Sequence, residues 1–237
     1  MELSALISSL RQARVVDLSQ TLEEQMPNFP THSKFFHNLW GAYQFGGRSL
    51  SYQLQVHEHN GTHVDAPVHF VREGKIEGRK TVEQIDPGHL IARGVKLDCR
   101  GSKEGDYVSL KFIQDWEAQH GQIEADDVVL FNFGWSEHWG LPPNNSRYLA
   151  DWPGVSMETA EYLVSKSVAA IGVDSLSPDP PAALDAHPIH PILLEKEVLI
   201  IENLTRLDEL PDFFLFVALP LKIKQGSGSP VRAIALI

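Results

Sequence analysis

The sequence predicts a single-domain protein of the α+β or mixed α/β class, and three observations support this. Its 237 residues, 43% hydrophobic and 22% charged, suffice for one substantial core. Segments with helical spacing and apolar runs of strand length are both present. They do not alternate strictly, which disfavours a doubly wound sheet or a regular α/β barrel. No repeat or domain boundary divides residues 1–237.

Helices are predicted by apolar spacing and by residues that cap helix ends. Leucine and isoleucine side chains at helical spacing predict a short amphipathic helix over residues 3–10. Ser109 can cap a helix that carries Ile113 and that Gly121 would end. Residues 156–165 have a similar pattern, so helices are expected at the start and in the middle of the chain.

Strands are predicted by alternating or continuous apolar runs. Val128–Phe133 is apolar except for one asparagine and is typical of a buried strand. Leu50–Val56 alternates and predicts a half-buried strand. The other strand candidates are 15–18, 90–97, 169–173, 198–201, 213–221 and 231–237. Proline, glycine or charge predicts loops and turns at 26–30, 72–80, 178–181 and 226–229.

Charge and cysteine content exclude several classes of partner. The net charge of −11 argues against nucleic acid and anionic membranes as partners. A single cysteine, Cys99, cannot form an internal disulfide, which favours a reducing compartment. No basic leader precedes an apolar segment at the N-terminus, and no apolar run has membrane-spanning length. A cytoplasmic protein is therefore expected.

The stretch of greatest chemical interest is residues 57–69, His-Glu-His-Asn-Gly-Thr-His-Val-Asp-Ala-Pro-Val-His. Four of the eleven histidines fall within it, and in an extended chain they share one side with Asp65. Imidazole and carboxylate ligands together suit zinc, manganese or ferrous iron. The stretch therefore predicts a metal site rather than a solvated polar strand.

Spacing within this stretch constrains its shape. His63 and Asp65 would lie roughly 6.6 Å apart in a strand, close enough to share one ion. His59 and His63 would lie roughly 13 Å apart, so the chain has to bend between them, and Gly61 permits a bend. Pro67 should end regular strand pairing. Beyond that proline, His69 can approach the site without joining the ligand set.

Competing motifs fail on inspection. The zincin pattern H-E-x-x-H, started at His57, would need a histidine where Gly61 stands. A cupin-like pair of His57 and His59 lacks a following glutamate. Ser136 lies in no complete G-x-S-x-G motif, and phosphate-binding and dinucleotide fingerprints are missing from the sequence.

Further candidates lie outside the histidine-rich stretch. Glu202 ends an apolar strand, a position open to a functional carboxylate and equally to a solvent-facing one. Phe29, Trp40 and Trp135 are candidate substrate contacts, with packing as the alternative for the aromatic N-terminal region. His138, which follows a buried strand, and His187 are left open as ligands or bystanders.

The segment His59–His69 resembles the H-x-G-T-H-x-D-x-P-x-H signature of the cyclase superfamily of metal-dependent hydrolases, which includes bacterial kynurenine formamidases and isatin hydrolases. The resemblance extends over nearly the whole chain, including Gly172–Ser175 and Ser229–Arg232. It implies a swivelling β/β/α fold with a central mixed sheet or small barrel flanked by helices. It also implies a homo-oligomer, a dimer or tetramer.

The same resemblance assigns roles to residues. His59, His63 and Asp65 would bind a divalent metal, and His69 would move protons. His190 lies twelve residues before Glu202, which matches the family spacing of a second ligand pair. The formamidase branch implies two zinc ions bridged by the motif aspartate, whereas the isatin hydrolase branch implies one manganese. Both options stay open, although Thr62 matches the G-T-H form of the latter branch.

Three functions follow from these observations. The first is hydrolysis of the C–N bond of a small aromatic amide, isatin-like or N-formylkynurenine-like, with water activated by the metal. The second is a metal-dependent oxygenase, which oxygen consumption would reveal. The third is a binding protein on the same fold, which would hold a ligand without turnover.

Overall fold

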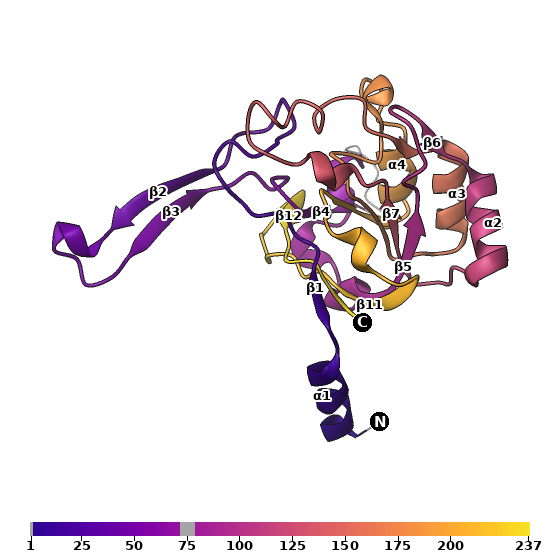
Figure 1. The fold of residues 1–237 in the computed structure, drawn as a ribbon, viewed down its shortest axis with the longest axis horizontal. Helices are drawn as coiled ribbons and strands as arrows, with labels where there is room; N and C mark the ends of the chain where they lie inside the picture. Colours follow the sequence, from indigo (N-terminus) through magenta and orange to yellow (C-terminus); the bar gives the residue numbers. More distant parts are fainter. Residues whose placement is uncertain (1, 72–78) are drawn as a thin grey trace.

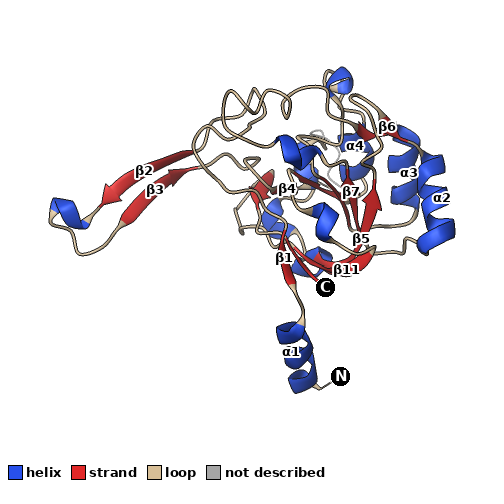
Figure 2. Ribbon diagram, viewed as in Figure 1, coloured by secondary structure: helices blue, strands red, loops and turns tan. Residues whose placement is uncertain are grey.

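A nine-stranded mixed sheet forms the centre of the computed structural model, which describes residues 2–71 and 79–237 (Figures 1 and 2). The strand order is β1-β13-β11-β5-β7-β9-β10-β4-β12. The strands are β1 (Val15–Asp17), β2 (Phe36–Gly41), β3 (Ser51–Gln55), β4 (His63–Asp65), β5 (Ile91–Asp98), β6 (Tyr107–Val108), β7 (Val128–Asn132), β8 (Gly154–Val155), β9 (Ala170–Val173), β10 (Leu199–Glu202), β11 (Phe213–Val217), β12 (Gly228–Pro230) and β13 (Ile234–Leu236). β2 pairs with β3 and β6 with β8 in two small separate sheets.

The large sheet is curled because its topology allows no flat arrangement. β12 lies at one edge and β13 beside the other, which would place them roughly 34 Å apart in a flat sheet with strands ~4.8 Å apart. Only residues 231–233 connect them, a segment that spans roughly 14 Å from end to end. Bridges from Ser19 to Leu204 and from Pro220 to Val231 close the curl. The sheet is thus a half-barrel, which confirms the predicted α+β fold with a central mixed sheet.

Four α-helices accompany the sheet in the described residues: α1 (Leu3–Gln12), α2 (Leu110–His120), α3 (Met157–Ser165) and α4 (Ile189–Leu194). α2, α3 and α4 gather on one side of the sheet, whereas α1 projects from the body (Figure 1). Among the described residues, no helix is long and apolar enough to cross a membrane.

Both faces of the central parallel strands are buried. In β7, Val129 and Phe131 belong to the apolar core beneath the helices, while Val128 and Leu130 face a second core inside the curl. Burial on both faces removes the need for polar alternation, which explains the continuous apolar run in this segment.

The helix predictions are confirmed by cap geometry. The Ser109 hydroxyl accepts a hydrogen bond from the Phe112 amide, and Gly121 follows the last residue of α2. Ser156 caps α3 in the same way, accepting from the Thr159 amide. Each cap satisfies an amide that the helix itself leaves unpaired.

Several strand predictions need correction. The segment 50–56 does form β3, but it is not half-buried, because it pairs only with β2 and stands away from the core. Residues 226–229 are not simply a turn, because Gly228–Pro230 form β12 and pair with β4. The strand predicted over 213–221 ends at Val217, before Pro220. Residues 72–78 of the predicted loop 72–80 lie outside the described residues.

A polar clamp fixes the bend in the histidine-rich stretch. Gly61 has φ +60°, so the turn expected there is present. The Thr62 hydroxyl donates to the Asn203 carbonyl at 2.6 Å and accepts from the Gln20 amide at 2.8 Å. The Asn203 side-chain amide donates to the Gly61 carbonyl at 3.0 Å. The end of β10 therefore holds the bend directly before β4.

We expect Thr62→Ala to destabilise the fold by about 1–3 kcal/mol, because it removes the partner of the buried Asn203 carbonyl and of the partly buried Gln20 amide. Each kcal/mol corresponds to a fall of roughly 2–4 °C in the melting temperature for a chain of this size. Calorimetry would measure the melting temperature of the variant. Thr62→Ser keeps the hydroxyl and should retain most of the stability; equal losses in the two variants would contradict the clamp.

Candidate metal centre

Two antiparallel strands place three candidate ligands together. In the register of β4 and β10, His63 stands opposite Glu202 and Asp65 opposite Ile200. Residues two apart on one strand share a face, so His63 and Asp65 point the same way. The His63 Nε2 atom lies 3.4 Å from Asp65 Oδ1 and 3.3 Å from Glu202 Oε2. The three side chains thus form a cluster with the donor atoms of a metal site.

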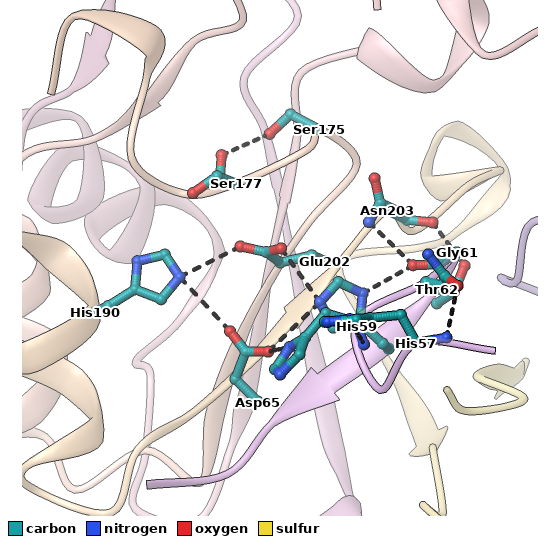
Figure 3. A network of polar contacts seen from close by, with 12 residues as sticks. His57, His59, Gly61, Thr62, Asp65, Ser175, Ser177, His190, Glu202 and Asn203 are labelled. Carbon is teal, nitrogen blue, oxygen red and sulfur yellow. Dashed lines mark hydrogen bonds and ion pairs between the residues drawn. The ribbon is translucent and has the colours of Figure 1, made fainter. Parts of the chain in front are cut away.

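α4 supplies His190 to the same cluster. Its Nε2 atom lies 3.5 Å from Asp65 Oδ2 and 3.5 Å from Glu202 Oε1. Figure 3 shows the two carboxylates between His190 on one side and His59 on the other. The structure therefore brings together the pair His190 and Glu202 with the motif residues.

Hydrogen bonds orient the two inner histidines. His63 Nδ1 lies 2.8 Å from the Gly61 carbonyl, and His190 Nδ1 lies 2.5 Å from Asp179 Oδ2. Each contact fixes a proton on Nδ1 and leaves Nε2 facing the carboxylates. Outer partners of this kind are typical of histidine metal ligands.

His59 and His69 form the other side of the cluster. His59 Nδ1 lies 2.6 Å from Asp65 Oδ1, and its ring stacks on that of His69 with centroids 4.0 Å apart. Its Nε2 lies 2.9 Å from the Ser227 hydroxyl. A Cβ at Gly228 would come within 2.5 Å of the His59 ring, so only glycine fits there. Donor atoms of His59, Asp65 and His69 lie within 4.8 Å of one another. His69 is therefore closer to His59 and Asp65 than its position in the sequence indicated.

The donor set fits a divalent cation. Asp65 is 1% exposed and Glu202 7% exposed, and Asp65 Oδ2 and Glu202 Oε1 have no hydrogen-bond partner among the described residues. Two buried carboxylates with unpaired oxygens are costly unless positive charge compensates them. With the Nε2 atoms of His63 and His190 beside the two carboxylates, the cluster offers the mixed nitrogen and oxygen ligands that zinc and manganese take.

The electrostatics of the site follow from burial and pairing. Burial opposes ionisation of Asp65, but the neighbouring histidines outweigh it and hold the pKa of this carboxyl well below its usual range. Burial disfavours the charged form of His63, yet hydrogen bonds to Asp65 and Glu202 raise its pKa to about 10. Burial lowers the pKa of His69 to about 4, against the attraction of Asp65, so this ring is neutral at pH 7.

The cluster opens into a cavity of about 210 Å³. Phe29, Phe70 and Leu176 form an apolar wall, and the histidines and carboxylates form the other side. The lining residues are Phe29, Thr31, His32, His59, His63, Asp65, His69, Phe70, Leu176, Ser177, His187, His190 and Glu202. A cavity with an apolar wall and a few convergent polar groups is typical of a small-molecule site.

The three aromatic candidates have different surroundings. Phe29 lies in the cavity wall, with its ring 5.2 Å from that of His32. Trp40 lies on β2, is 76% exposed, and does not line the cavity. Trp135 is buried in the core, where its Nε1–H donates to the Tyr148 carbonyl. Trp40 and Trp135 are therefore not brought to the cavity of this chain.

The two undecided histidines are separated by the fold. His138 packs against Trp135 and does not line the cavity. His187 does line it, with its ring 5.4 Å from that of His190. Its Nδ1 lies 3.9 Å from the carboxylate of Asp179, so it is a neighbour of the inner cluster.

Sequence reasoning missed Asp179, His32 and Phe70. Asp179 is fully buried and accepts from the Ile189 amide as well as facing His190. It stands between two prolines, in a segment without helical or strand periodicity, so no local pattern marks it. His32 is distant from the motif in sequence and meets it only after folding. Phe70 follows His69 directly, but only the fold shows that it lines the cavity.

A curled mixed sheet with converging histidines and carboxylates defines a protein with a candidate His/carboxylate metal centre. The chain belongs to the Cyclase family, whose model matches residues 16–180. An isatin hydrolase of Roseibium aggregatum is 33% identical over 190 residues, 76% of this chain and 72% of the relative. A kynurenine formamidase of Erythrobacter litoralis is 30% identical over 226 residues, 94% of each chain.

Solved structures agree with this family. Isatin hydrolase A from Ralstonia solanacearum superposes with a TM-score of 0.92 at 31% identity, over 100% of this chain and 97% of that one. An isatin hydrolase bound to the product analogue thioisatinate superposes with a TM-score of 0.90 at 26% identity, over 100% and 99%. The expected family resemblance and fold are both confirmed.

Proposed function

We propose that this protein is a metal-dependent hydrolase that cleaves the C–N bond of a small aromatic amide. The observation that carries this proposal is the buried pair Asp65 and Glu202, which faces a small aromatic-walled cavity. One oxygen of each carboxylate lies near His63 Nε2, and the other oxygen, which has no hydrogen-bond partner among the described residues, lies 3.5 Å from His190 Nε2. Relatives named isatin hydrolase and kynurenine formamidase support the same reaction class.

The proposed ligands are His59, His63, Asp65, His190 and Glu202. A bound divalent ion supplies Lewis-acid chemistry, activating water and polarising a carbonyl. The two oxygens of Asp65 face different histidines, Oδ1 toward His59 and His63 and Oδ2 toward His190. This arrangement would let Asp65 hold zinc or manganese together with the histidines on both of its sides.

His69 is the proposed proton carrier. It lines the cavity, lies against His59, and is neutral at pH 7, so it can accept a proton from water and return it to the leaving nitrogen. Phe29 and Phe70 would hold the aromatic ring of the substrate by apolar contact.

The cavity favours a neutral substrate. Among its described lining residues there is no lysine or arginine. A substrate with a free α-carboxylate would find no lysine or arginine among these residues to bind that group. A neutral cyclic amide of the isatin type needs no such partner, and its hydrolysis adds one water to give an amine and a carboxylate within one product. We therefore place isatin-like amides before N-formylkynurenine.

A panel assay tests this function. We expect purified protein with its metal to open isatin faster than it deformylates N-formylkynurenine, and elemental analysis to show zinc or manganese. Absorbance follows both reactions, and an oxygen electrode tests for an oxygenase. Oxygen consumption, or full metal occupancy with no turnover across small aromatic amides, would contradict the proposal.

We expect His63→Ala to lose both metal and activity, because its Nε2 lies between Asp65 and Glu202 at the centre of the donor set. Elemental analysis of the purified variant measures the metal. His89, an exposed histidine that does not line the cavity, provides the matched control, and His89→Ala should keep its metal. Full occupancy in His63→Ala would exclude it as a ligand.

We expect Asp179→Asn to weaken metal binding by ~10–100-fold, the usual effect of removing an outer partner of a histidine ligand. Chelator competition followed by calorimetry measures the affinity. Asp185→Asn removes an exposed charge from the same loop and should leave affinity unchanged. Unaltered affinity in Asp179→Asn would mean that His190 needs no orienting carboxylate.

We expect His69→Ala to keep its metal and its fold and to lose ~10²-fold or more in kcat, the range for loss of an acid–base group. His138→Ala, which lies outside the cavity, serves as control. Loss of metal in His69→Ala would make His69 a ligand, an outcome its closeness to His59 and Asp65 makes worth measuring. Near-normal kcat would remove it from the reaction.

A further inference from the structure

Six aromatic side chains form a closed collar of ring contacts around the cavity. Each ring lies next to two others of the six, with centroids 4.0–6.2 Å apart. All six residues line the cavity. In order around the collar they are His59, His69, Phe70, His187, Phe29 and His32. The collar thus joins the apolar wall to the metal cluster along two different paths.

His69 and His32 occupy the two junctions of this collar. His69 lies between Phe70 of the apolar wall and His59 of the metal cluster, with ring centroids 4.7 and 4.0 Å away. His32 lies between Phe29 of the wall and His59, with centroids 5.2 and 5.5 Å away. The proposed proton transfer uses His69 and gives His32 no role. His32 is therefore the junction residue whose chemistry is still unused.

The position of His32 is fixed by several contacts. Its ring stacks on that of His57 with centroids 4.2 Å apart and planes inclined by 14°. Its amide donates to the Phe29 carbonyl at 2.9 Å, and its carbonyl accepts from the Asn28 side chain at 2.8 Å. Asn28 in turn accepts from the Asn60 side chain at 2.6 Å. Ring and backbone are thus anchored to the stretch that supplies the proposed metal ligands.

The ring of His32 offers a hydrogen-bond donor to a ligand. Its Nδ1 atom is buried and has no hydrogen-bond partner among the described residues. A hydrogen on Nδ1 would lack an acceptor, so the ring keeps its hydrogen on Nε2, which is not closed off in this way. Nε2 is therefore the nitrogen that a ligand in the cavity can reach. His187 differs, because the Asp179 carboxylate 3.9 Å from its Nδ1 favours a hydrogen there and leaves Nε2 as an acceptor.

We propose that His32 is a specificity-determining residue, which donates a hydrogen bond from Nε2 to a carbonyl oxygen beside the scissile amide. This inference rests on the proposed function and narrows its substrate class. The preferred substrates are aryl amides in which a second carbonyl is bonded directly to the scissile carbonyl carbon, as in isatin.

The order of residues in the collar matches the connectivity of such a cyclic amide. In isatin, two atoms join the benzene ring to the scissile carbon: the amide nitrogen and the carbon of the second carbonyl. With the benzene ring against Phe29 and Phe70 and the scissile carbonyl toward the metal cluster, each of these two atoms faces one junction. His69 then serves the nitrogen and His32 the second carbonyl. N-formylkynurenine has no carbonyl bonded to its scissile carbon, so it cannot make this contact.

Calorimetric binding of two hydrolysis products to the metal-loaded protein tests this role without turnover. Isatinate, the product of isatin, keeps the second carbonyl, whereas 2-aminophenylacetate has a methylene in its place. We expect wild-type protein to bind isatinate roughly five- to tenfold more tightly, the effect of one hydrogen bond. His32→Phe should remove this preference by weakening the binding of isatinate alone. His32→Gln, which keeps an N–H donor near the position of Nε2, should retain most of the preference.

His37→Phe makes the same change at an exposed histidine outside the cavity lining and should leave both affinities unchanged. Circular dichroism and metal analysis should show that all three variants are folded and loaded. Absence of isatinate binding, equal wild-type affinity for the two products, or an equal loss of both in His32→Phe would overturn the proposal. A protein that shows the preference but does not open isatin would contradict the proposed hydrolase and support His32 as a carbonyl-binding residue.

Discussion

The structure depends on two carboxylates, Asp65 and Glu202, held side by side in a buried site. Each would be costly to bury alone, and together they repel. His63 on β4 and His190 on α4 reduce the free-energy cost of burying these carboxylates, because each histidine lies beside both of them. Two of the carboxylate oxygens still have no hydrogen-bond partner within the part of the chain that the structure describes. This incomplete neutralisation is the physical reason to regard the cluster as a cation site rather than as a structural ion-pair network.

The curl of the sheet makes the cluster possible. β4 is only three residues long, but it is paired with β10 on one side and β12 on the other, which restrains its two proposed ligands, His63 and Asp65. Gly228 on β12 allows the closest approach to His59, and Asn203 at the end of β10 holds the bend at Gly61. Backbone pairing and small side chains thus set the geometry of the ligands, while Asp179 and the Gly61 carbonyl set the direction of their rings. Such double restraint is what a preorganised metal site requires.

The regions around this core differ in what they bury. The helices α2, α3 and α4 cover one face of the sheet with a continuous apolar core. The two-stranded arm formed by β2 and β3 and the helix α1, in contrast, present apolar side chains that the described chain leaves exposed. The segment that leaves the arm at Val56 enters the histidine-rich stretch at once. The arm and the candidate metal site are consequently neighbours along the chain.

The sequence by itself determined the elements whose signals are local. The cap at Ser109, the helix over residues 156–165, the buried run in β7 and the bend at Gly61 all follow from residue chemistry within a few positions, and the structure confirms them. One-sided placement of His63 and Asp65 follows from strand periodicity alone. For the same reason, the histidine-rich stretch could be identified as a candidate metal site before any tertiary contact was known.

Only the tertiary structure decided what depends on contacts distant in sequence. Ser227 and Gly228 lie beside His59 because the sheet curls, and no local pattern distinguishes that pairing from an ordinary glycine–serine turn. Alternation in the segment 50–56 indicated a half-buried strand. Alternation predicts the strand itself, but whether another element covers its apolar face depends on the rest of the fold. Asp179 contacts His190 from a loop that has no helical or strand periodicity. Trp40 lies on the exposed strand β2 and Trp135 lies in the buried core, so neither reaches the cavity. Local chemistry fixes conformation over a few residues, whereas burial and ligand geometry are properties of the assembled fold.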